Sequence, residues 1–180
     1  MRSDKLIFSR GLVFNTKIIN DFYKIDSNNF DSIYRWTKEK HTNVIKSKKT
    51  EFIFIKDKKE IVGYINFINI TKNKYLEMQD DSKYNDIHRK DILKFNKNND
   101  NYININTISI KNEYQNKKSI IKIANVIKKY LHNKKINGFI IKGIIAITAS
   151  NFERDILSYM NFKKISKNND NFSIFIFEDL

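Results

Sequence analysis

The sequence predicts a mixed α/β (α+β) fold, in which a mostly antiparallel central sheet contains one parallel, splayed strand pair and is flanked by helices. Three observations support this prediction. Residues 101–110 alternate like a half-buried strand, an amphipathic helix follows as far as Leu131, and residues 137–149 form an apolar run of strand length. Strand, helix and strand in this order make a right-handed βαβ unit with parallel strands. Short polar connections elsewhere predict antiparallel hairpins.

The strand at residues 101–110 contains a break in its alternation. Ile103 and Ile105 alternate with asparagines, but the next apolar pair, Ile108 and Ile110, begins three residues later instead of two. One extra residue at positions 106–107 keeps both pairs on the same face, which is what a β-bulge does. We expect this bulge to splay the strand from its parallel neighbour. A bulged strand that runs into a helix N-terminus is suited to hold an anion-bearing cofactor.

The amino-terminal part of the chain is expected to supply strands and helices at residues 5–8 (strand), 16–23 and 30–40 (helices), and 51–56 and 60–71 (strands). The first helix is expected to begin at Asn15 or Thr16, whose side chains can cap it. The second helix presents Trp36 and other aromatic residues, which either pack in the core or line a substrate site. Apolar residues on both faces of the last strand predict a sheet covered on both sides.

Residues 72–100 are polar and irregular and are predicted to be an insertion between the third and fourth strands, with short helices near Tyr75 and Ile92. Such an insertion is either a lid that contacts substrate or a surface elaboration without a role. A helix that begins at Ser150 or Asn151 and a closing hairpin, with strands at residues 162–166 and 172–178, complete the chain. By length, residues 1–180 form one domain.

Composition narrows the classes of function. The absence of cysteine excludes disulfides, thiolate ligands and a cysteine nucleophile, and three widely separated histidines predict no metal site. The net charge of +14 at pH 7 comes mostly from scattered lysines in a chain rich in Asn and Ile, as AT-rich codons produce, so nucleic acid is not the expected partner. The amino-terminal residues do not have the apolar run of a signal peptide, and no run of residues is apolar enough to span a membrane. We therefore expect a cytoplasmic protein.

The order of these elements resembles that of the GCN5-related N-acetyltransferase (GNAT) family. The resemblance rests on three segments: IVGYI at residues 61–65, similar to the family's third strand; ISIKNEYQNKKSIIKIA at residues 108–124, similar to its fourth strand, pyrophosphate loop and helix; and TASNFERDILSYMNF at residues 148–162, similar to its last motif. It implies an enzyme that transfers an acetyl group from acetyl-coenzyme A directly to a primary amine of a small molecule or a protein.

The resemblance also implies the residues that bind the coenzyme, in a cleft between residues 108–110 and the parallel strand. They are Ile108, Ser109, Ile110, Gln115, Asn116, Lys117, Lys118, Ser119, Ile120 and Asn151. Lys118 and Ile120 stand where the family's Gln/Arg-x-x-Gly-x-Gly/Ala loop has small residues. We expect lysine side chains at the helix N-terminus to replace part of what glycines give.

Acyl transfer needs a base for the amine, donors for the oxyanion and an acid for the thiolate. Glu51, Glu77 and Glu113 are candidate bases, and Glu113 is the one assigned to the site. The family often has a tyrosine seven residues after the asparagine, a position that Ser158 occupies when counted from Asn151. Tyr159, the next residue, is therefore the candidate acid, and packing is its alternative role. The alternative function is a catalytically inactive GNAT-like module that binds protein or nucleic acid through its basic surface. Either protein is expected to be a monomer or a homodimer.

Overall fold

The structure, a computed structural model, describes residues 6–10, 15–32, 35–46, 48–80, 87–165 and 172–177. In chain order its elements are β1 (Leu6–Ser9), α1 (Thr16–Asn29), α2 (Lys38–Lys46), β2 (Thr50–Asp57), β3 (Glu60–Ile70), α3 (Lys72–Glu77), η2 (Arg89–Asp91), β4 (Ile92–Leu93), β5 (Asp100–Ile110), η3 (Asn112–Tyr114), α4 (Lys117–Ile136), β6 (Ile140–Thr148), α5 (Asn151–Tyr159), β7 (Lys163–Lys164) and β8 (Ser173–Phe177). Here η denotes a 3₁₀ helix.

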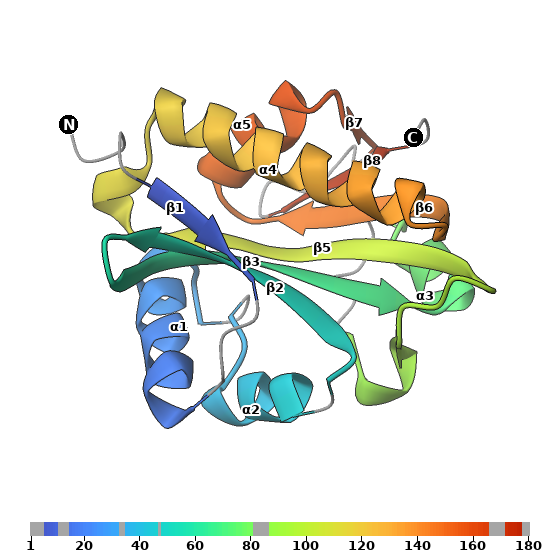
Figure 1. Ribbon diagram of the computed structural model, residues 1–180, viewed down its shortest axis with the longest axis horizontal. Coiled ribbons are helices and arrows are strands. Elements are labelled where there is room, and N and C mark those ends of the chain that lie inside the picture. The colour runs from blue at the N-terminus through green and yellow to red at the C-terminus, as the bar shows by residue number, and fades with distance from the viewer. Residues whose placement is uncertain are drawn as a thin grey trace.

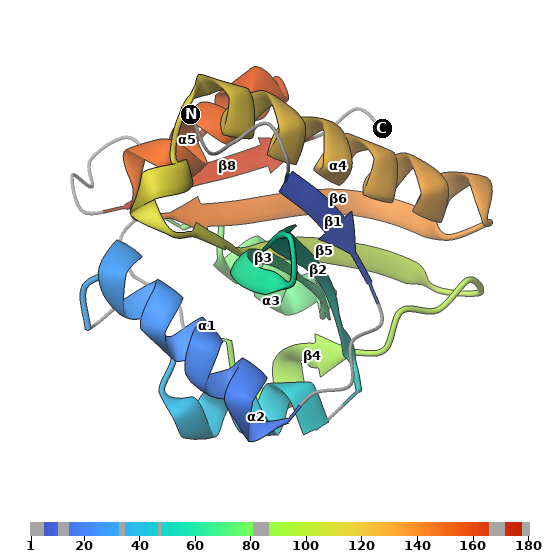
Figure 2. The ribbon, with the colours of Figure 1, turned by 60° about the vertical axis from the view of Figure 1, so that its left-hand side comes forward.

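The sheet has the order β1-β2-β3-β5-β6-β8-β7, and the short strand β4 pairs with β3. Only β5 and β6 are parallel among the described pairs; every other described pair is antiparallel. Helices α4 and α5 cover one face of the sheet, and α1 and α2 cover the other (Figures 1 and 2). The predicted mixed, mostly antiparallel sheet between helices is therefore confirmed.

The predicted bulge in β5 is confirmed at Asn106. On the neighbouring strand β3, Asn66 pairs with Thr107 and the next residue, Phe67, pairs with Ile105, so Asn106 has no partner there. The extra residue restores the alternation of faces. As a result Ile103, Ile105, Ile108 and Ile110 all lie in the same buried cluster, beneath α4.

The parallel pair is splayed, as predicted. Pairing between β5 and β6 begins at Asp100 with Ile140 and ends at Asn104 with Ile145, although both strands continue. Beyond that point β5 stays with β3, and β6 stays with β8. We call residues 100–104 the closed half of β5 and residues 107–110 its open half, because the open half has no strand on the β6 side among the described residues.

Two predicted helices were misplaced. The helix predicted at residues 30–40 is wrong: α1 continues to Asn29, and the next helix, α2, begins only at Lys38. The helix predicted around Ile92 is wrong because Ile92 and Leu93 form strand β4. The cause is tertiary: β3 extends two residues beyond its pairing with β2, and β4 pairs with that free end at Asn69 and Ile70.

The remaining elements fall close to their predicted positions. Helix α1 is capped by Asn15, whose Oδ1 accepts a hydrogen bond from the Ile18 amide at 3.0 Å. The short helix predicted near Tyr75 is α3. The predicted turn at residues 167–171 lies outside the described residues. Within the described part of the chain, no helix combines the length and the apolar character that crossing a membrane requires.

Candidate active site

A cavity of about 60 Å³ lies at the bulge of β5, where the closed half ends and the open half begins, on the side of the sheet covered by α1 and α2. Strand β5 contributes Asn104, Asn106 and Thr107 to its lining, and α5 contributes Glu153. Asp26, at the carboxyl-terminal end of α1, lies across from them. The splay, the bulge and the first helix therefore meet in one polar site.

Glu153 connects the two strands where they no longer pair. Its Oε1 accepts a hydrogen bond from the Ile108 amide at 3.4 Å, and its Oε2 accepts from the amides of Ala149 and Ser150 at 3.3 and 3.4 Å. The Ser150 hydroxyl also donates to Oε2, at 3.1 Å. The carboxylate thus occupies main-chain donors that converge from the open half of β5 and from the end of β6.

Burial raises the pKa of the Glu153 carboxyl from its ordinary value of 4.5 to about 7. The side chain is only 4% exposed, and desolvation disfavours its charged form. The hydrogen bonds from Ser150, Ile108 and Ala149 act in the opposite direction but do not cancel the effect of burial. A carboxyl group that titrates near neutrality can take up or release a proton during a reaction at that pH.

A second buried cluster lies on the α1 side of the cavity. The Tyr64 hydroxyl donates to Asp26 Oδ2 at 2.6 Å, and His41 Nε2 lies 3.1 Å from the same oxygen. The Tyr64 ring stacks on Phe22, with ring centroids 4.0 Å apart. Burial and the neighbouring Asp26 carboxylate raise the pKa of Tyr64 well above 10, so the hydroxyl stays a donor.

The predicted pyrophosphate loop leads from the open half of β5 into α4. Asn116 caps the helix, since its Oδ1 accepts from the Ser119 amide at 3.1 Å. Gln115 Nε2 donates to Asn29 Oδ1 at 2.8 Å and to the Ile110 carbonyl at 3.1 Å, which ties the end of β5 to α1. Asn29 also donates to the Ser109 hydroxyl, at 2.9 Å.

The side chains at the start of α4 divide into two groups. Lys117 and Lys118 are exposed, while Ser119 is buried and Ile120 packs partly buried against the core. The positive end of the helix dipole and two lysines therefore lie beside the end of the open half, an arrangement that favours a negatively charged group there.

Other predicted site residues lie apart from the cavity. Tyr159 is 46% exposed on α5, with Lys128 Nζ 5.4 Å from its ring centroid, and it is not among the residues that line the cavity. Glu113 is exposed in η3, and Asn151 is the first residue of α5 and accepts a hydrogen bond from Arg154. Their roles stay predictions. The other two candidate bases have lysine partners: Glu51 pairs with Lys134 and Glu77 with Lys74.

Sequence reasoning missed Glu153, Asp26 and Asn104. For Glu153 a signal was present: Ser150 and Glu153 have the spacing of a capping box, and the structure contains that motif. For Asp26 no local signal exists, because α1, α2 and β3 bring its partners together only in the folded chain. In the described part of the structure, no group of three or more histidine, aspartate and glutamate side chains could hold a metal ion.

Many solved structures match the chain at low sequence identity, three of them over nearly its whole length as follows. NAA60 from Arabidopsis thaliana, in complex with acetyl-CoA, is 14% identical with a TM-score of 0.61, covering 96% of this chain and 97% of that chain. The Campylobacter jejuni N-acetyltransferase PseH, in complex with acetyl coenzyme A, is 12% identical with a TM-score of 0.52, covering 97% and 99%. A GNAT-family protein from Desulfovibrio desulfuricans is 11% identical with a TM-score of 0.56, covering 96% and 98%.

Together with the sheet order and the splayed parallel pair, these matches show that the chain has the GNAT fold. No protein-family model and no curated protein sequence matches it. At such low identity the likeness defines the fold, and the chemistry has to be argued from the residues of this chain.

Proposed function

We propose that the protein transfers an acetyl group from acetyl-coenzyme A to a primary amine by direct attack of the amine on the thioester. The observation that carries this proposal is the open half of β5, where the Ile108 amide is directed away from β3 toward the end of β6. Two structural neighbours, NAA60 and PseH, have been solved with acetyl-coenzyme A, which supports the same cosubstrate here.

The residues present fit this cosubstrate. A thioester arm with amide groups can pair with the main chain at Ile108 and Ile110, as an added strand does on a free edge. Lys117, Lys118 and the first-turn amides of α4 suit the diphosphate. Gln115 and Asn116 hold this loop in place through the hydrogen bonds described above. The cosubstrate supplies the activated acetyl group.

The chain's own groups would handle the charge and the protons. Transfer forms a C–N bond and breaks the thioester C–S bond; the acceptor ammonium gives up two protons, of which one ends on the thiolate. The Ile108 amide is a donor for the developing oxyanion once Glu153 releases it. Glu153, with a pKa of about 7, is then a nearby group that can accept a proton. Tyr159 and Glu113, the acid and base predicted from the sequence, do not line the cavity, and no proton transfer is assigned to them in this proposal.

Coenzyme binding tests the proposal directly. Acetyl-coenzyme A is titrated into the wild type and into K117A/K118A, with K128A/K129A as a control that removes the same charge from the other half of α4. We expect the first double variant to bind about tenfold more weakly and the control to bind like the wild type, because phosphate contacts by lysine are local. An absence of binding by the wild type at millimolar coenzyme would refute the proposal.

Turnover can be followed by the free thiol that the reaction releases. The chain has no cysteine, so a thiol reagent gives no background from the protein itself. A panel of primary amines, including a lysine-containing peptide, then identifies acceptors. Release of thiol that depends on an added amine is the expected result, while release at the same rate without an amine indicates hydrolysis alone.

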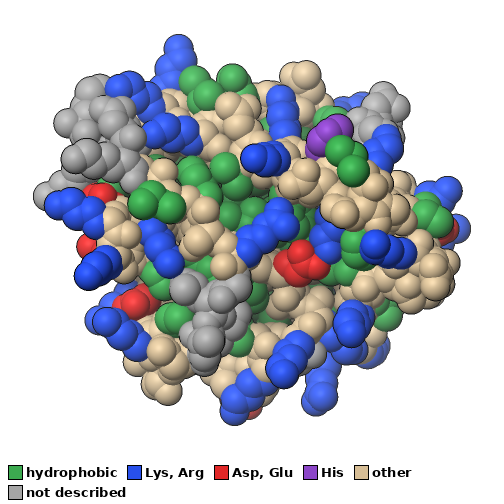
Figure 3. Space-filling view, viewed as in Figure 1, with side chains coloured by type: hydrophobic (Ala, Val, Ile, Leu, Met, Phe, Trp, Pro, Cys, Tyr) green, Lys and Arg blue, Asp and Glu red, His purple; other side chains and the backbone are tan. Residues whose placement is uncertain are grey.

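The alternative function is an inactive module that binds nucleic acid or protein through its basic surface, and the net charge of +14 favours it. In Figure 3, however, lysine and arginine side chains are spread over the whole of the face shown and do not gather in one patch. This alternative requires nucleic-acid affinity that falls steeply with salt. A single domain over residues 1–180, a cytoplasmic location and a monomeric or homodimeric state stay predictions.

A further inference from the structure

A chain of hydrogen bonds runs along the wall of the cavity. Asn104 Nδ2 donates to Asn106 Oδ1 at 3.4 Å, and Asn106 Nδ2 donates to Thr107 Oγ1 at 3.0 Å. Thr107 in turn hydrogen-bonds to Tyr64, whose hydroxyl donates to Asp26 Oδ2. The chain thereby connects the bulge of β5 with helix α1.

Both ends of this chain leave an oxygen without a partner. Asp26 Oδ1 and Asn104 Oδ1 are buried and accept no hydrogen bond from any described residue, and both residues line the cavity. The two residues are 3% and 2% exposed. A buried acceptor without a donor costs about 1–3 kcal/mol, so such a pair in one cavity indicates a ligand that supplies the donors.

The ligand group that fits these oxygens is an ammonium. It has several N–H donors and no acceptor, and it complements the Asp26 carboxylate. The cavity, at about 60 Å³, has room for an ammonium and the first atoms attached to it, but not for a bulky acceptor. The rest of the acceptor therefore extends to the rim.

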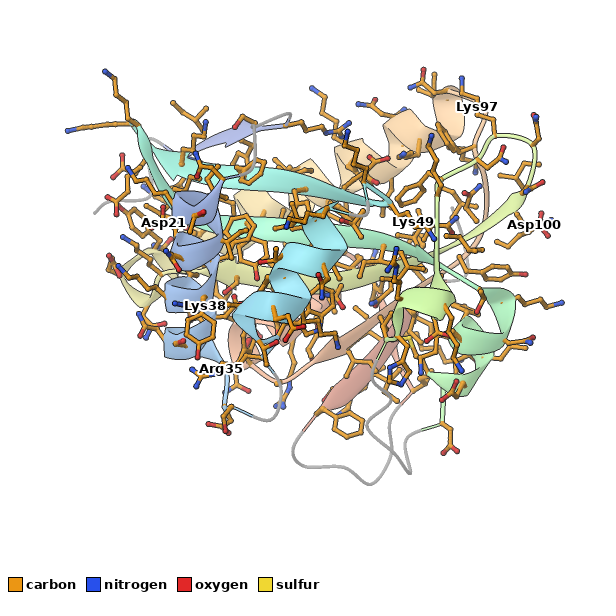
Figure 4. The ribbon with its side chains drawn as sticks, turned by 90° about the horizontal axis from the view of Figure 1, so that it is seen from below. Asp21, Arg35, Lys38, Lys49, Lys97 and Asp100 are labelled. Carbon is orange, nitrogen blue, oxygen red and sulfur yellow. The ribbon has the colours of Figure 1, made fainter. Side chains whose placement is uncertain are left out.

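The rim of the cavity carries a positive charge, opposite to that of the Asp26 carboxylate. Arg35 lines the cavity and is half-buried, and the one contact of its guanidinium that the described residues provide is the Tyr23 ring, 5.3 Å away. Lys38 contacts the same ring at 5.1 Å but does not line the cavity. Figure 4 shows Arg35 and Lys38 beside α1. An arginine with its donors available at the rim suits a carboxylate, which it can bind in a bidentate manner.

We propose that this cavity is the acceptor subsite and that the acceptor is a free amino acid, with its ammonium on Asp26 and Asn104 and its carboxylate on Arg35. Half-buried Phe30 and Trp36 at the same rim would contact an apolar side chain. The inference rests on the proposed acetyl transfer, which it deepens by naming the class of acceptor. It places the amine on the α1 side of the sheet, opposite α4.

Steady-state kinetics with matched acceptors tests this assignment. The panel pairs L-phenylalanine with 2-phenylethylamine, which lacks the carboxylate, and with phenylalanine methyl ester; glycine, β-alanine and 4-aminobutyrate vary the distance between the two charges. We expect kcat/KM to be at least about tenfold higher for an amino acid than for its amine, since a charged hydrogen-bonded pair contributes that much. Equal values for both would overturn the assignment.

Arg35→Ala and the matched control Lys38→Ala separate a specific contact from general charge. Arg35→Ala should raise KM for the amino acid about tenfold to a hundredfold and leave KM for the amine unchanged, whereas Lys38→Ala should retain the wild-type preference. The amino acid and the amine differ in basicity, but this difference is the same in every variant. It therefore cancels when the KM ratio of the two acceptors is compared between variants. An unchanged preference in Arg35→Ala contradicts the role of Arg35.

Asp26→Asn tests the ammonium site. It should raise KM for amino acid and amine alike by about tenfold or more, while acetyl-coenzyme A affinity and the melting temperature report whether the fold is retained. Unchanged KM values in a folded Asp26→Asn variant would rule out the ammonium site.

Coenzyme binding and acceptor preference together show whether the acceptor assignment or the proposed acetyl transfer is wrong. If the wild type binds and uses acetyl-coenzyme A but shows no amino-acid preference, only the acceptor assignment fails. If the wild type does not bind the coenzyme, the proposed function fails. Thermal stabilisation by L-phenylalanine alone, present in the wild type and absent in Asp26→Asn, then still supports the cavity as an amino-acid site, and its absence counts against it.

Discussion

The closed half of β5 contains two buried asparagines, Asn101 near its start and Asn104 at its end, and the two side chains are in opposite states. In the closed half, Asn101 Nδ2 reaches the carbonyls of Asn96, Asn99 and Ile140 at 2.7, 2.8 and 3.0 Å. Its Oδ1 accepts from Asn69 Nδ2 and from the Asn96 amide, both at 3.1 Å. Asn104, where pairing with β6 ends, makes one long hydrogen bond and leaves its Oδ1 without a partner.

This difference shows which polar groups serve the fold and which are available to a ligand. Asn101 is completely buried and satisfies main-chain groups of the turn before β5 and of its neighbour β6, so its role is structural. Asn104 and Asp26 retain unused acceptors, which the fold tolerates only at a cost in stability. Such a cost in stability is expected at positions whose side chains bind a ligand and do not primarily stabilise the fold.

The largest expected effect separates these two asparagines by stability. Asn101→Leu should lower the free energy of unfolding by about 3–5 kcal/mol, because it leaves several buried donors and acceptors unpaired. Asn104→Leu should cost less than about 1 kcal/mol, since it removes an oxygen that has no partner. Urea unfolding followed by circular dichroism measures both values. Similar costs for the two substitutions would contradict the assignment of a structural role to Asn101 and a ligand-binding role to Asn104.

The next effect concerns pH and Glu153, which bridges the open half. Because burial raises the pKa of Glu153 from 4.5 to about 7, the folded protein binds more protons than the unfolded protein between these pH values. Glu153 therefore contributes to the free energy of unfolding by an amount on the order of 3 kcal/mol. This contribution is fully present below about pH 4.5 and is lost as the pH rises through about 7.

Glu153→Gln removes this titration and keeps the shape of the side chain. Its free energy of unfolding, measured in urea from pH 4 to pH 8, should fall less steeply over that interval than that of the wild type. The two curves should run parallel above about pH 7.5, where the wild-type carboxyl has lost its proton. Curves that are parallel throughout would show that Glu153 titrates in the folded protein as it does in the unfolded chain.

A smaller effect compares two buried tyrosines that are stacked in the same way. Tyr64 stacks on Phe22 at 4.0 Å and donates to Asp26, while Tyr130 stacks on Phe67 at 3.9 Å and donates to Glu51 at 3.1 Å. Tyr64→Phe should cost about 2 kcal/mol, because buried Asp26 then keeps only His41 as a partner.

Tyr130→Phe is the matched control on the other face of the sheet. It should cost less than about 1 kcal/mol, because Glu51 keeps its ion pair with Lys134 and remains partly exposed to water. Thermal unfolding of both variants at one pH gives the comparison. A larger loss of stability in Tyr130→Phe than in Tyr64→Phe would mean that the hydrogen bond from Tyr64 to Asp26 stabilises the fold less than its geometry indicates.

Features that depend on neighbouring residues were predictable from the sequence. The broken alternation between Ile105 and Ile108 predicted the bulge, because side-chain direction in a strand follows a period of two. The βαβ order predicted the parallel pair and hence the place of the splay. The capping box at Ser150 and Glu153 was also readable, but nothing local showed that the same carboxylate reaches the Ile108 amide of another strand.

Features that depend on distant segments were not predictable. Strand β4 forms only because β3 offers it a free edge, and the sequence around Ile92 fits a helix equally well. Asp26, His41 and Tyr64 come from α1, α2 and β3, and a single chain of residues gives no distance between them. The open half of β5 could therefore be located from the sequence, while the acceptors that face it could not.

The smallest expected effect concerns Tyr159, the acid predicted from the sequence. An acid must come within hydrogen-bond reach of the sulfur that leaves, and so it has to face the splay between β5 and β6. The Tyr159 ring is instead nearly half exposed and packs beside Lys128, outside the cavity lining. We therefore expect Tyr159→Phe to change kcat by less than about twofold, against at least about tenfold for Glu153→Gln. A hundredfold loss of kcat with unchanged KM in Tyr159→Phe would instead assign the proton to Tyr159, and it would require α5 to turn its exposed face toward the open half of β5 during the reaction.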